Sequence, residues 1–284
     1  MGWWGEEAAA GEVGELLPIA TVAAAVVLVG SSSLHGLLPA AHQPGLPANR
    51  VRQITGVLRA GINLSNFLLV TGRTEKSEPV GVAPDMAREI ANKLGVPVTY
   101  VPFKTPGELA DQAGKNVWDI GLIGAEPQRA EKIAFTAAYV EIEATYMVPA
   151  ESPITSIADV DRKGVRIAVS ARSAYDLWLE NNIRNATLVR VSGLDAAYQT
   201  FMADKLDVLA GLRPGLLKDV EKAPGLKILD GKFTAVQQAV GTAKPNVAGA
   251  AFLAEFVETA KKSGLVASLI ERHKVKGLSV APPA

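Results

Sequence analysis

Strand-like and helix-like segments alternate along the chain from residue 55 onward. Between residues 81 and 95, Met86, Ile90 and Leu94 recur every four positions, which predicts one apolar face of a helix that ends at Gly95. The next run, VPVTYVPF at residues 96–103, is rich in β-branched and aromatic residues and predicts a strand. Strands that alternate with helices predict α/β lobes with largely parallel sheets.

The same alternation predicts the remaining elements. Two blocks, at about residues 55–147 and 152–234, each show it, and a return segment follows them. Further strands are expected at residues 58–63, 118–124, 144–150, 165–170, 186–193, 206–212, 226–231 and 236–243. Further helices are expected at residues 105–116, 174–185, 194–205, 214–223, 246–264 and 265–274, and a short helix followed by a turn is expected at residues 156–164.

The N-terminal region differs from the rest of the chain. Residues 16–30 form an uncharged apolar run of 15, shorter than the ~20 residues of a comfortable membrane span but typical of a signal-peptide core. Small residues, prolines and glycines follow, so residues 1–50 are interpreted as a leader and flexible lead-in of an exported, periplasmic protein. The acidic start, MGWWGEEAAAGEVGE, disagrees with a signal peptide and leaves three alternatives: a start site upstream of the true one, an atypical signal or anchor, or a buried core helix.

The charge pattern and the cysteine content of the sequence argue against several classes of function. Residues 1–49 hold four glutamates and no lysine or arginine, so the remainder carries 29 basic and 25 acidic residues without a long basic run. This pattern does not suggest nucleic-acid binding. The chain has no cysteine, and none of its three histidines has a ligand-spaced partner, so no metal or other cofactor is expected.

The stretch GAEPQRAEKIAFT (124–136) is the first candidate for chemistry. It follows a predicted strand and opens what is interpreted as a helix, and ligands of α/β sheets bind at such places. Arg129 lies near the start of this helix, where positive charge is disfavoured unless an anion is bound. An arginine guanidinium can donate two parallel hydrogen bonds to a carboxylate in a bidentate arrangement. The alternative is a solvated side chain, or one that pairs with Glu126 or Asp111.

The order of these segments resembles the extracellular solute-binding proteins, family 3, which serve ABC importers of polar amino acids. The family's F-D-A…G-M-T-I-T-P-E-R-A…F-S-x-P-Y has its counterpart in WDIGLIGAEPQRAEKIAFTAAYV, and its K-G-x-x-V-G-V-x-x-G-T-T in RKGVRIAVSARSAYD. The resemblance covers about residues 55–280 and implies a type II periplasmic binding fold, with two Rossmann-like α/β lobes and a ligand cleft between them. It implies lobe 1 at residues 55–148 and 238–280, lobe 2 at 149–237, and hinges near 148–151 and 234–238.

The resemblance also implies a ligand site. Arg129 occupies the position of the arginine that grips the α-carboxylate in the family, with Gly124 and Glu126 in the same stretch. In lobe 2, Ser173 offers an N–H and a hydroxyl, or simply caps a helix, and Arg172 is either a second cation of the cleft or a solvated loop residue. After the first strand, Asn66 and Phe67 are candidates, Phe67 as an apolar wall of the ligand site or as part of the core.

Two departures from the family pattern concern the ligand. The stretch before Arg129 is about two residues shorter than usual and lacks the usual hydroxyl side chains. The aspartate that binds the ligand's ammonium in the family is replaced, and the matching position is identified as Gly211. An unpaired buried ammonium is costly, so we expect a carboxylate ligand more firmly than an amino acid, unless Glu126 or Glu141 replaces the aspartate.

The resemblance implies a periplasmic substrate-binding protein that takes a small carboxylate-bearing solute, an amino acid or related organic acid, to an ABC permease in the inner membrane. A monomer that closes by hinge motion is expected. The alternatives are a periplasmic cyclohexadienyl-type dehydratase on the same fold, with Glu126 or Glu141 as its acid, and a ligand-sensing module. No pair of acid and base side chains supports an enzyme.

Overall fold

The computed structural model describes residues 56–284, so the predicted leader lies outside the described part of the chain. The strands in this part are β1 (Leu58–Asn63), β2 (Gly72–Arg73), β3 (Pro79–Val80), β4 (Val98–Phe103), β5 (Ile120–Gly124), β6 (Ile133–Phe135), β7 (Val140–Pro149), β8 (Arg166–Ser170), β9 (Thr187–Val191), β10 (Val208–Leu212), β11 (Leu226–Ile228), β12 (Thr234–Ala243) and β13 (Ser279–Val280). The helices are α1 (Val82–Leu94), α2 (Pro106–Asp111), α3 (Pro127–Ala130), α4 (Ala174–Asn182), α5 (Leu194–Ala203), α6 (Arg213–Lys222), α7 (Val247–Lys262) and α8 (Leu265–Arg272).

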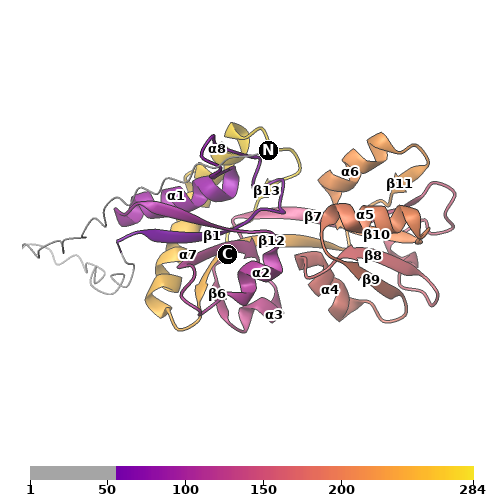
Figure 1. Cartoon of the computed structure of the whole chain (residues 1–284), viewed down its shortest axis with the longest axis horizontal. Helices are drawn as coiled ribbons and strands as arrows, with labels where there is room; N and C mark the ends of the chain where they lie inside the picture. Colours follow the sequence, from indigo (N-terminus) through magenta and orange to yellow (C-terminus); the bar gives the residue numbers. More distant parts are fainter. Residues whose placement is uncertain (1–55) are drawn as a thin grey trace, which may run out of the picture. The chain divides into compact units, whose positions relative to one another are not determined.

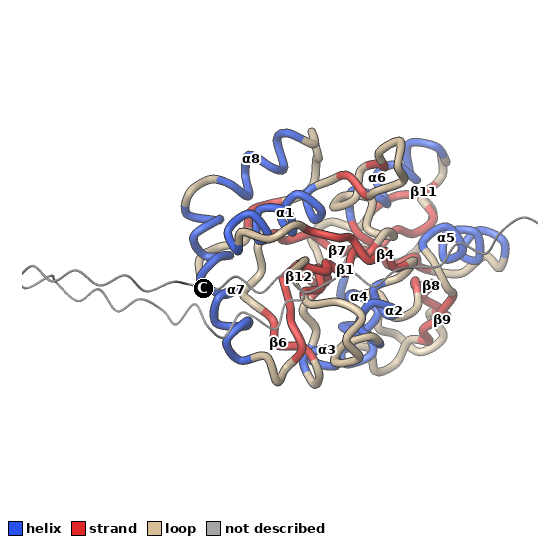
Figure 2. The backbone as a smooth tube through the Cα atoms, turned by 60° about the vertical axis from the view of Figure 1, so that its left-hand side comes forward, coloured by secondary structure: helices blue, strands red, loops and turns tan. Residues whose placement is uncertain are grey.

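Two parallel groups of strands are joined by two long antiparallel strands (Figures 1 and 2). The main sheet has the order β4-β1-β5-β12-β7-β10-β8-β9. β1 pairs in parallel with β4 and β5, and β8 pairs in parallel with β9 and β10. β12 and β7 run antiparallel to each other and to their outer neighbours β5 and β10, so both chain crossings between the groups lie in these strands.

Each parallel group has its own apolar core. In the first lobe, α1, α7 and α8 bury residues such as Met86, Val257 and Leu269 against β1 and β5. In the second lobe, α4 packs on one face, and α5 and α6 pack on another around Phe201 and Leu216. Both crossing strands contribute to both lobes; in β12, Val236 belongs to the second core and Val240 to the first. This is the mixed α/β, two-lobed architecture that the sequence predicts, whereas the residue bounds expected for the lobes and hinges stay predictions.

The helix caps are confirmed where the sequence carries a specific capping residue. The Thr105 hydroxyl accepts the N–H of Glu108 at 3.2 Å, and the Ser173 hydroxyl accepts the N–H of Asp176 at 3.1 Å. Gly95 ends α1 in the left-handed conformation with φ 69°.

Three of the expected helices are short in the structure. Residues 156–164 form only a single 3₁₀ turn, Ile157–Asp159. Helix α2 ends at Asp111, because turns with positive φ at Gly114 and Asn116 follow it. The segment with Arg129 is one helical turn, after which the chain forms the short strand β6. The helix expected at this stretch is therefore present, but it is one turn long.

Candidate functional site

The two lobes meet around a cavity of about 70 Å³. It lies at the carboxyl ends of β1, β5, β8 and β10, where the lobes of an α/β protein are expected to bind a ligand. Of the predicted site residues, Asn66, Gly124, Arg129 and Ser173 line it. We call this cavity the cleft.

Arg129 is the principal charged group of the cleft. Its side chain is 6% exposed, and its guanidinium donates to the carbonyl of Gly124 at 2.8 Å and to the carbonyl of Arg172 at 2.9 Å. Across residues 56–284, no carboxylate forms an ion pair with it. Burial lowers the pKa of Arg129 to about 10, so the group stays charged at neutral pH. A buried cation that holds only neutral carbonyls is a ready site for an anion.

Glu126 lies beside Arg129 but does not line the cleft. It is the residue before α3, and its side chain does not cap that helix. Burial raises the pKa of Glu126 to about 7, although the nearby charge of Arg129 opposes this shift. At neutral pH this carboxyl is therefore only partly ionised, and it only partly balances Arg129.

The charges of the cleft are all positive. Lys104, which the sequence did not single out, lines the cavity together with Arg129, and the described part of the wall includes no acidic residue. Gln238, 5% exposed, is a further polar group of the wall. Lys104 follows β4, at the same edge of the sheet as Asn63 and Gly124, and that position at a strand end is the signal by which it could have been found.

Ser173 and Tyr175 bring the start of α4 to the cleft. The Ser173 hydroxyl is engaged as the cap of α4, so helix capping and a place in the cleft wall are combined in one residue. Asp176 accepts the N–H of Arg172 at 2.7 Å and the side chain of Arg190 at 2.8 Å, which fixes the turn before the helix. Burial raises the pKa of Tyr175 to about 12, so its hydroxyl stays protonated.

Arg172 does not place its cation in the cleft. Its guanidinium makes two bonds to Asp111 of the first lobe, at 2.9 and 2.7 Å, and only its backbone carbonyl contacts Arg129. Its φ of 59° lies in the left-handed region, where the family motif has a glycine. The expected second cation of the cleft is thus, in this structure, part of a bridge between the lobes.

Asn66 and Phe67 lie in the loop after β1. The Asn66 side-chain oxygen accepts the N–H groups of Leu68 and Leu69 at 3.2 and 3.3 Å, so this oxygen shapes the loop. Gly81 lets the loop pack closely on the start of α1, because with φ 150° any side chain there would collide with the carbonyl of Leu69. Phe67 faces a second cavity instead of the cleft.

The end of β10 carries no acid. A side chain at Gly211 would point at Leu216 in the core of the second lobe, 2.9 Å from its nearest methyl carbon. The residue of β10 that lines the cleft is Leu212. The structure therefore puts Leu212, and not Gly211, in the wall of the cleft, and neither residue is acidic.

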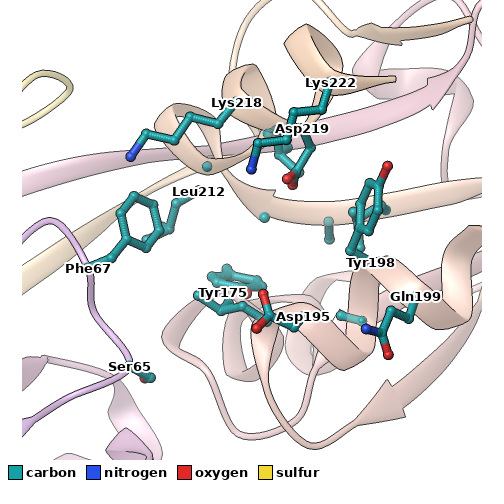
Figure 3. Close-up of a pocket in the computed structure, with 17 residues that line it drawn as sticks. Ser65, Phe67, Tyr175, Asp195, Tyr198, Gln199, Leu212, Lys218, Asp219 and Lys222 are labelled. Atoms are coloured by element: carbon teal, nitrogen blue, oxygen red, sulfur yellow. The ribbon is translucent and has the colours of Figure 1, made fainter. Parts of the chain in front are cut away.

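A larger cavity of about 620 Å³ adjoins the cleft (Figure 3). It lies between α5 and α6 of the second lobe and reaches Ser65 and Phe67 of the first. We call it the side pocket. The roles of all these residues in ligand binding stay predictions.

Comparison with known proteins identifies relatives of this two-lobed structure. A family model described as bacterial extracellular solute-binding proteins, family 3, matches residues 61–275. The L-cystine-binding protein TcyJ of Escherichia coli (strain K12) is 22% identical over 194 residues, which are 68% of this chain and 73% of TcyJ.

Solved structures share the fold at low identity. A putative binding component of an ABC transporter from Wolinella succinogenes DSM 1740, complexed with lysine, has a TM-score of 0.65 and 20% identity over 77% of this chain and 96% of its own. The holo ArgBP from T. maritima has a TM-score of 0.59 and 21% identity over 76% and 95%. The ancestral amino-acid-binding protein AncCDT-1, a precursor of cyclohexadienyl dehydratase, has a TM-score of 0.63 and 20% identity over 78% and 96%. These similarities confirm the type II periplasmic binding fold.

Proposed function

Because the chain belongs to the bacterial extracellular solute-binding proteins, family 3, we propose that it binds a small carboxylate for uptake by an ABC permease. Arg129 is the reason for proposing a carboxylate ligand, because its side chain is buried, lines the cleft and has no ion-pair partner among the described residues. A carboxylate would replace the carbonyl contacts of the guanidinium with charge-assisted hydrogen bonds, which are about twice as strong as neutral ones.

The same wall disfavours a free α-amino group on the solute. Lys104 and Arg129 give the cleft two positive charges, and Leu212 stands at the strand end where an acid would hold an ammonium. A zwitterion would bury its ammonium without a partner, at a cost of several kcal/mol. The proposed ligand class is therefore organic acids without a cationic α-nitrogen.

Closure of the lobes is proposed to trap the solute. In the structure the lobes already touch through Arg129 and the carbonyl of Arg172, through Arg172 and Asp111, and through Gln128 and the carbonyl of Leu177. A cleft of about 70 Å³ is small for a solute, since ligand pockets usually have ~300 Å³ or more. Loading thus requires the lobes to separate, with β7 and β12 as the proposed hinge strands and a monomer as the acting unit.

A dehydratase is the second candidate, because of Glu126. A carboxyl with a pKa of about 7 beside a buried arginine suits a general acid. However, Glu126 does not line the cleft in this arrangement of the lobes. Turnover of prephenate or arogenate by the purified protein would favour this candidate over binding alone.

A thermal-shift screen over amino acids, dicarboxylates and aromatic acids tests the proposal. Amine-free acids are expected to raise the melting temperature, and their amide or methyl-ester analogues are expected to have no effect. A screen in which amino acids bind and their deaminated analogues do not would contradict the proposed ligand class. The predicted periplasmic location rests on residues outside the described part of the chain, and a fusion of residues 1–50 to a secretion reporter tests it separately.

A further inference from the structure

The side pocket and the cleft share part of their walls. Four residues line both: Ser65, Tyr175, Leu194 and Leu212. The two cavities therefore adjoin at Tyr175 of α4 and Leu212 of β10, and a ligand that extends from Arg129 past these side chains would enter the side pocket. This route passes the strand end at which an acidic residue is missing, because Leu212 occupies it.

The wall of the side pocket is apolar and aromatic near this route. Phe67 comes from the loop after β1, Tyr175 from α4 and Tyr198 from α5, and Figure 3 shows the three rings around the space below α6. Leu194, Leu209 and Leu216 add aliphatic surface. Aromatic walls of this kind favour flat apolar groups, which stack on them or meet their edges.

The charged groups of the side pocket lie along α5 and α6. They are Lys218, Asp219 and Lys222 on α6, and Asp195 on α5. The Lys218 ammonium lies 4.9 Å from the centre of the Phe67 ring. Two positive and two negative side chains give this wall no net charge. The fixed charge that selects the ligand is in the cleft.

The volumes of the two cavities indicate that they hold different parts of one ligand. The cleft, at about 70 Å³, has room for a carboxylate and little more, whereas the side pocket, at about 620 Å³, falls within the range of ~300–1,000 Å³ that is usual for organic ligands. We propose that the solute is an arylalkanoate: its carboxylate binds Arg129 in the cleft, and its aromatic body passes Leu212 into the side pocket. This inference rests on the proposed function, since it names the substrate class of the same site.

Gly215 offers a way to close the side pocket without touching the cleft. It lies in the first turn of α6, and a Cβ atom there would stand 3.2 Å from Cζ of Phe67. Gly215→Leu is therefore expected to fill the gap between α6 and Phe67. Glu221→Leu is the matched control, because it adds the same side chain to the same helix at an exposed position outside both cavities.

The test compares acetate, phenylacetate and 3-phenylpropanoate by calorimetry, with NMR titration for weak binding. The wild-type protein is expected to bind 3-phenylpropanoate about 10-fold to 100-fold more tightly than acetate, the gain from burying an aromatic body. Gly215→Leu should remove at least tenfold of the 3-phenylpropanoate affinity and leave acetate unchanged, and Glu221→Leu should change neither.

A second measurement uses the wild-type protein alone, in case Gly215→Leu does not fold. NMR should show nuclear Overhauser contacts from the ring of 3-phenylpropanoate to Phe67 and Tyr198. Equal affinities for acetate and 3-phenylpropanoate, or ring contacts that avoid both residues, would overturn the inference and leave the proposed carboxylate site standing. Failure of every carboxylate to bind, or binding that ignores Arg129→Gln, would instead overturn the proposed function and this inference with it.

Discussion

The bridge between Arg172 and Asp111 gives a direct way to test closure of the lobes. Its two bonds, 2.7 and 2.9 Å long, join α2 of the first lobe to the turn before α4 of the second. Asp111→Asn keeps the size of the side chain and removes its charge. If closure accompanies ligand binding, this change should weaken the closed state and thereby the apparent affinity for the solute.

The expected magnitude is modest because the bridge is exposed. The side chains of Arg172 and Asp111 are 55% and 50% exposed, and exposed pairs contribute about 0.2–1 kcal/mol. The two-pronged geometry favours the upper half of this range, so Asp111→Asn should weaken binding about twofold to fivefold. The hydrogen bond with Arg172 lowers the pKa of Asp111, so its contribution is complete above the ordinary aspartate pKa and is lost as the pH falls through the lowered value.

The assay is calorimetry on the best ligand of the screen, together with X-ray scattering to follow closure. Arg172→Gln and the double variant complete a cycle, in which the double variant should be no weaker than either single variant. Arg166→Gln is the control, since it breaks a similarly exposed bridge to Asp207 within the second lobe and should leave affinity unchanged. Equal affinities for the Asp111→Asn variant and the wild-type protein would show that this bridge does not stabilise the ligand-bound closed state.

Three further predictions concern the cleft and the fold. Leu212→Asp should give the cleft a partner for an ammonium, so calorimetry should show a higher affinity for phenylalanine and a lower affinity for 3-phenylpropanoate. Gly211→Asp should only destabilise the protein, because its side chain would collide with Leu216. The same change in ligand preference in both variants would contradict the assignment of Leu212. An anion at Arg129 should raise the pKa of Glu126 further above its value of about 7, so the protein should take up a fraction of a proton when it binds the anion at pH 7. Calorimetry in buffers of different ionisation enthalpy measures this proton uptake. Uptake that persists in Glu126→Gln would assign the proton to another group. Asp85→Asn should lower the free energy of unfolding at pH 7 by about 1–3 kcal/mol, because buried Asp85 binds Arg272, the last residue of α8, at 3.1 Å and His273, the residue after it, at 2.9 Å. Burial opposes the charge of Asp85, but these contacts and Arg88 outweigh burial and lower its pKa. Denaturant titrations should therefore show the difference between the variant and the wild type shrinking as the pH falls below the ordinary aspartate pKa of 3.8, and a difference that does not change with pH would contradict this account.

The sequence predicts the fold because its signals are local and periodic. The apolar spacing of Met86, Ile90 and Leu94 and the caps at Thr105 and Ser173 each act within one or two turns of the chain. Such signals depend only on residues that are close in the sequence, and the structure contains the helices that carry them. The helix predicted at residues 105–116 fails at its end, where positive-φ turns override the periodicity.

The site is less predictable because it is assembled from distant segments. The sequence places Arg129 near a helix start, but one of the two carbonyls that its guanidinium binds belongs to Arg172, 43 residues away. The salt bridge between Arg172 and Asp111 joins residues that are 61 positions apart, so no local sequence pattern predicts it. Strand β10 gives a further example, because the packing of Leu216 beneath the strand decides that Leu212, and not Gly211, lines the cleft.

Among residues 56–284, none of the helices combines the length and hydrophobicity that a membrane crossing needs. The apolar run at residues 16–30 lies outside this part, and its role as an export signal stays a prediction.

The most direct measurement is calorimetric titration of one carboxylate ligand into the wild-type protein and its Arg129→Gln and Arg129→Lys variants, with melting temperatures to establish that all three fold. Loss of a buried charged partner costs about 2–5 kcal/mol, so Arg129→Gln should weaken binding at least about 30-fold. Arg129→Lys keeps the charge but loses the two-pronged fork and should fall between the two. A folded Arg129→Gln variant that binds the carboxylate as tightly as the wild type would contradict the central claim that Arg129 holds the anion.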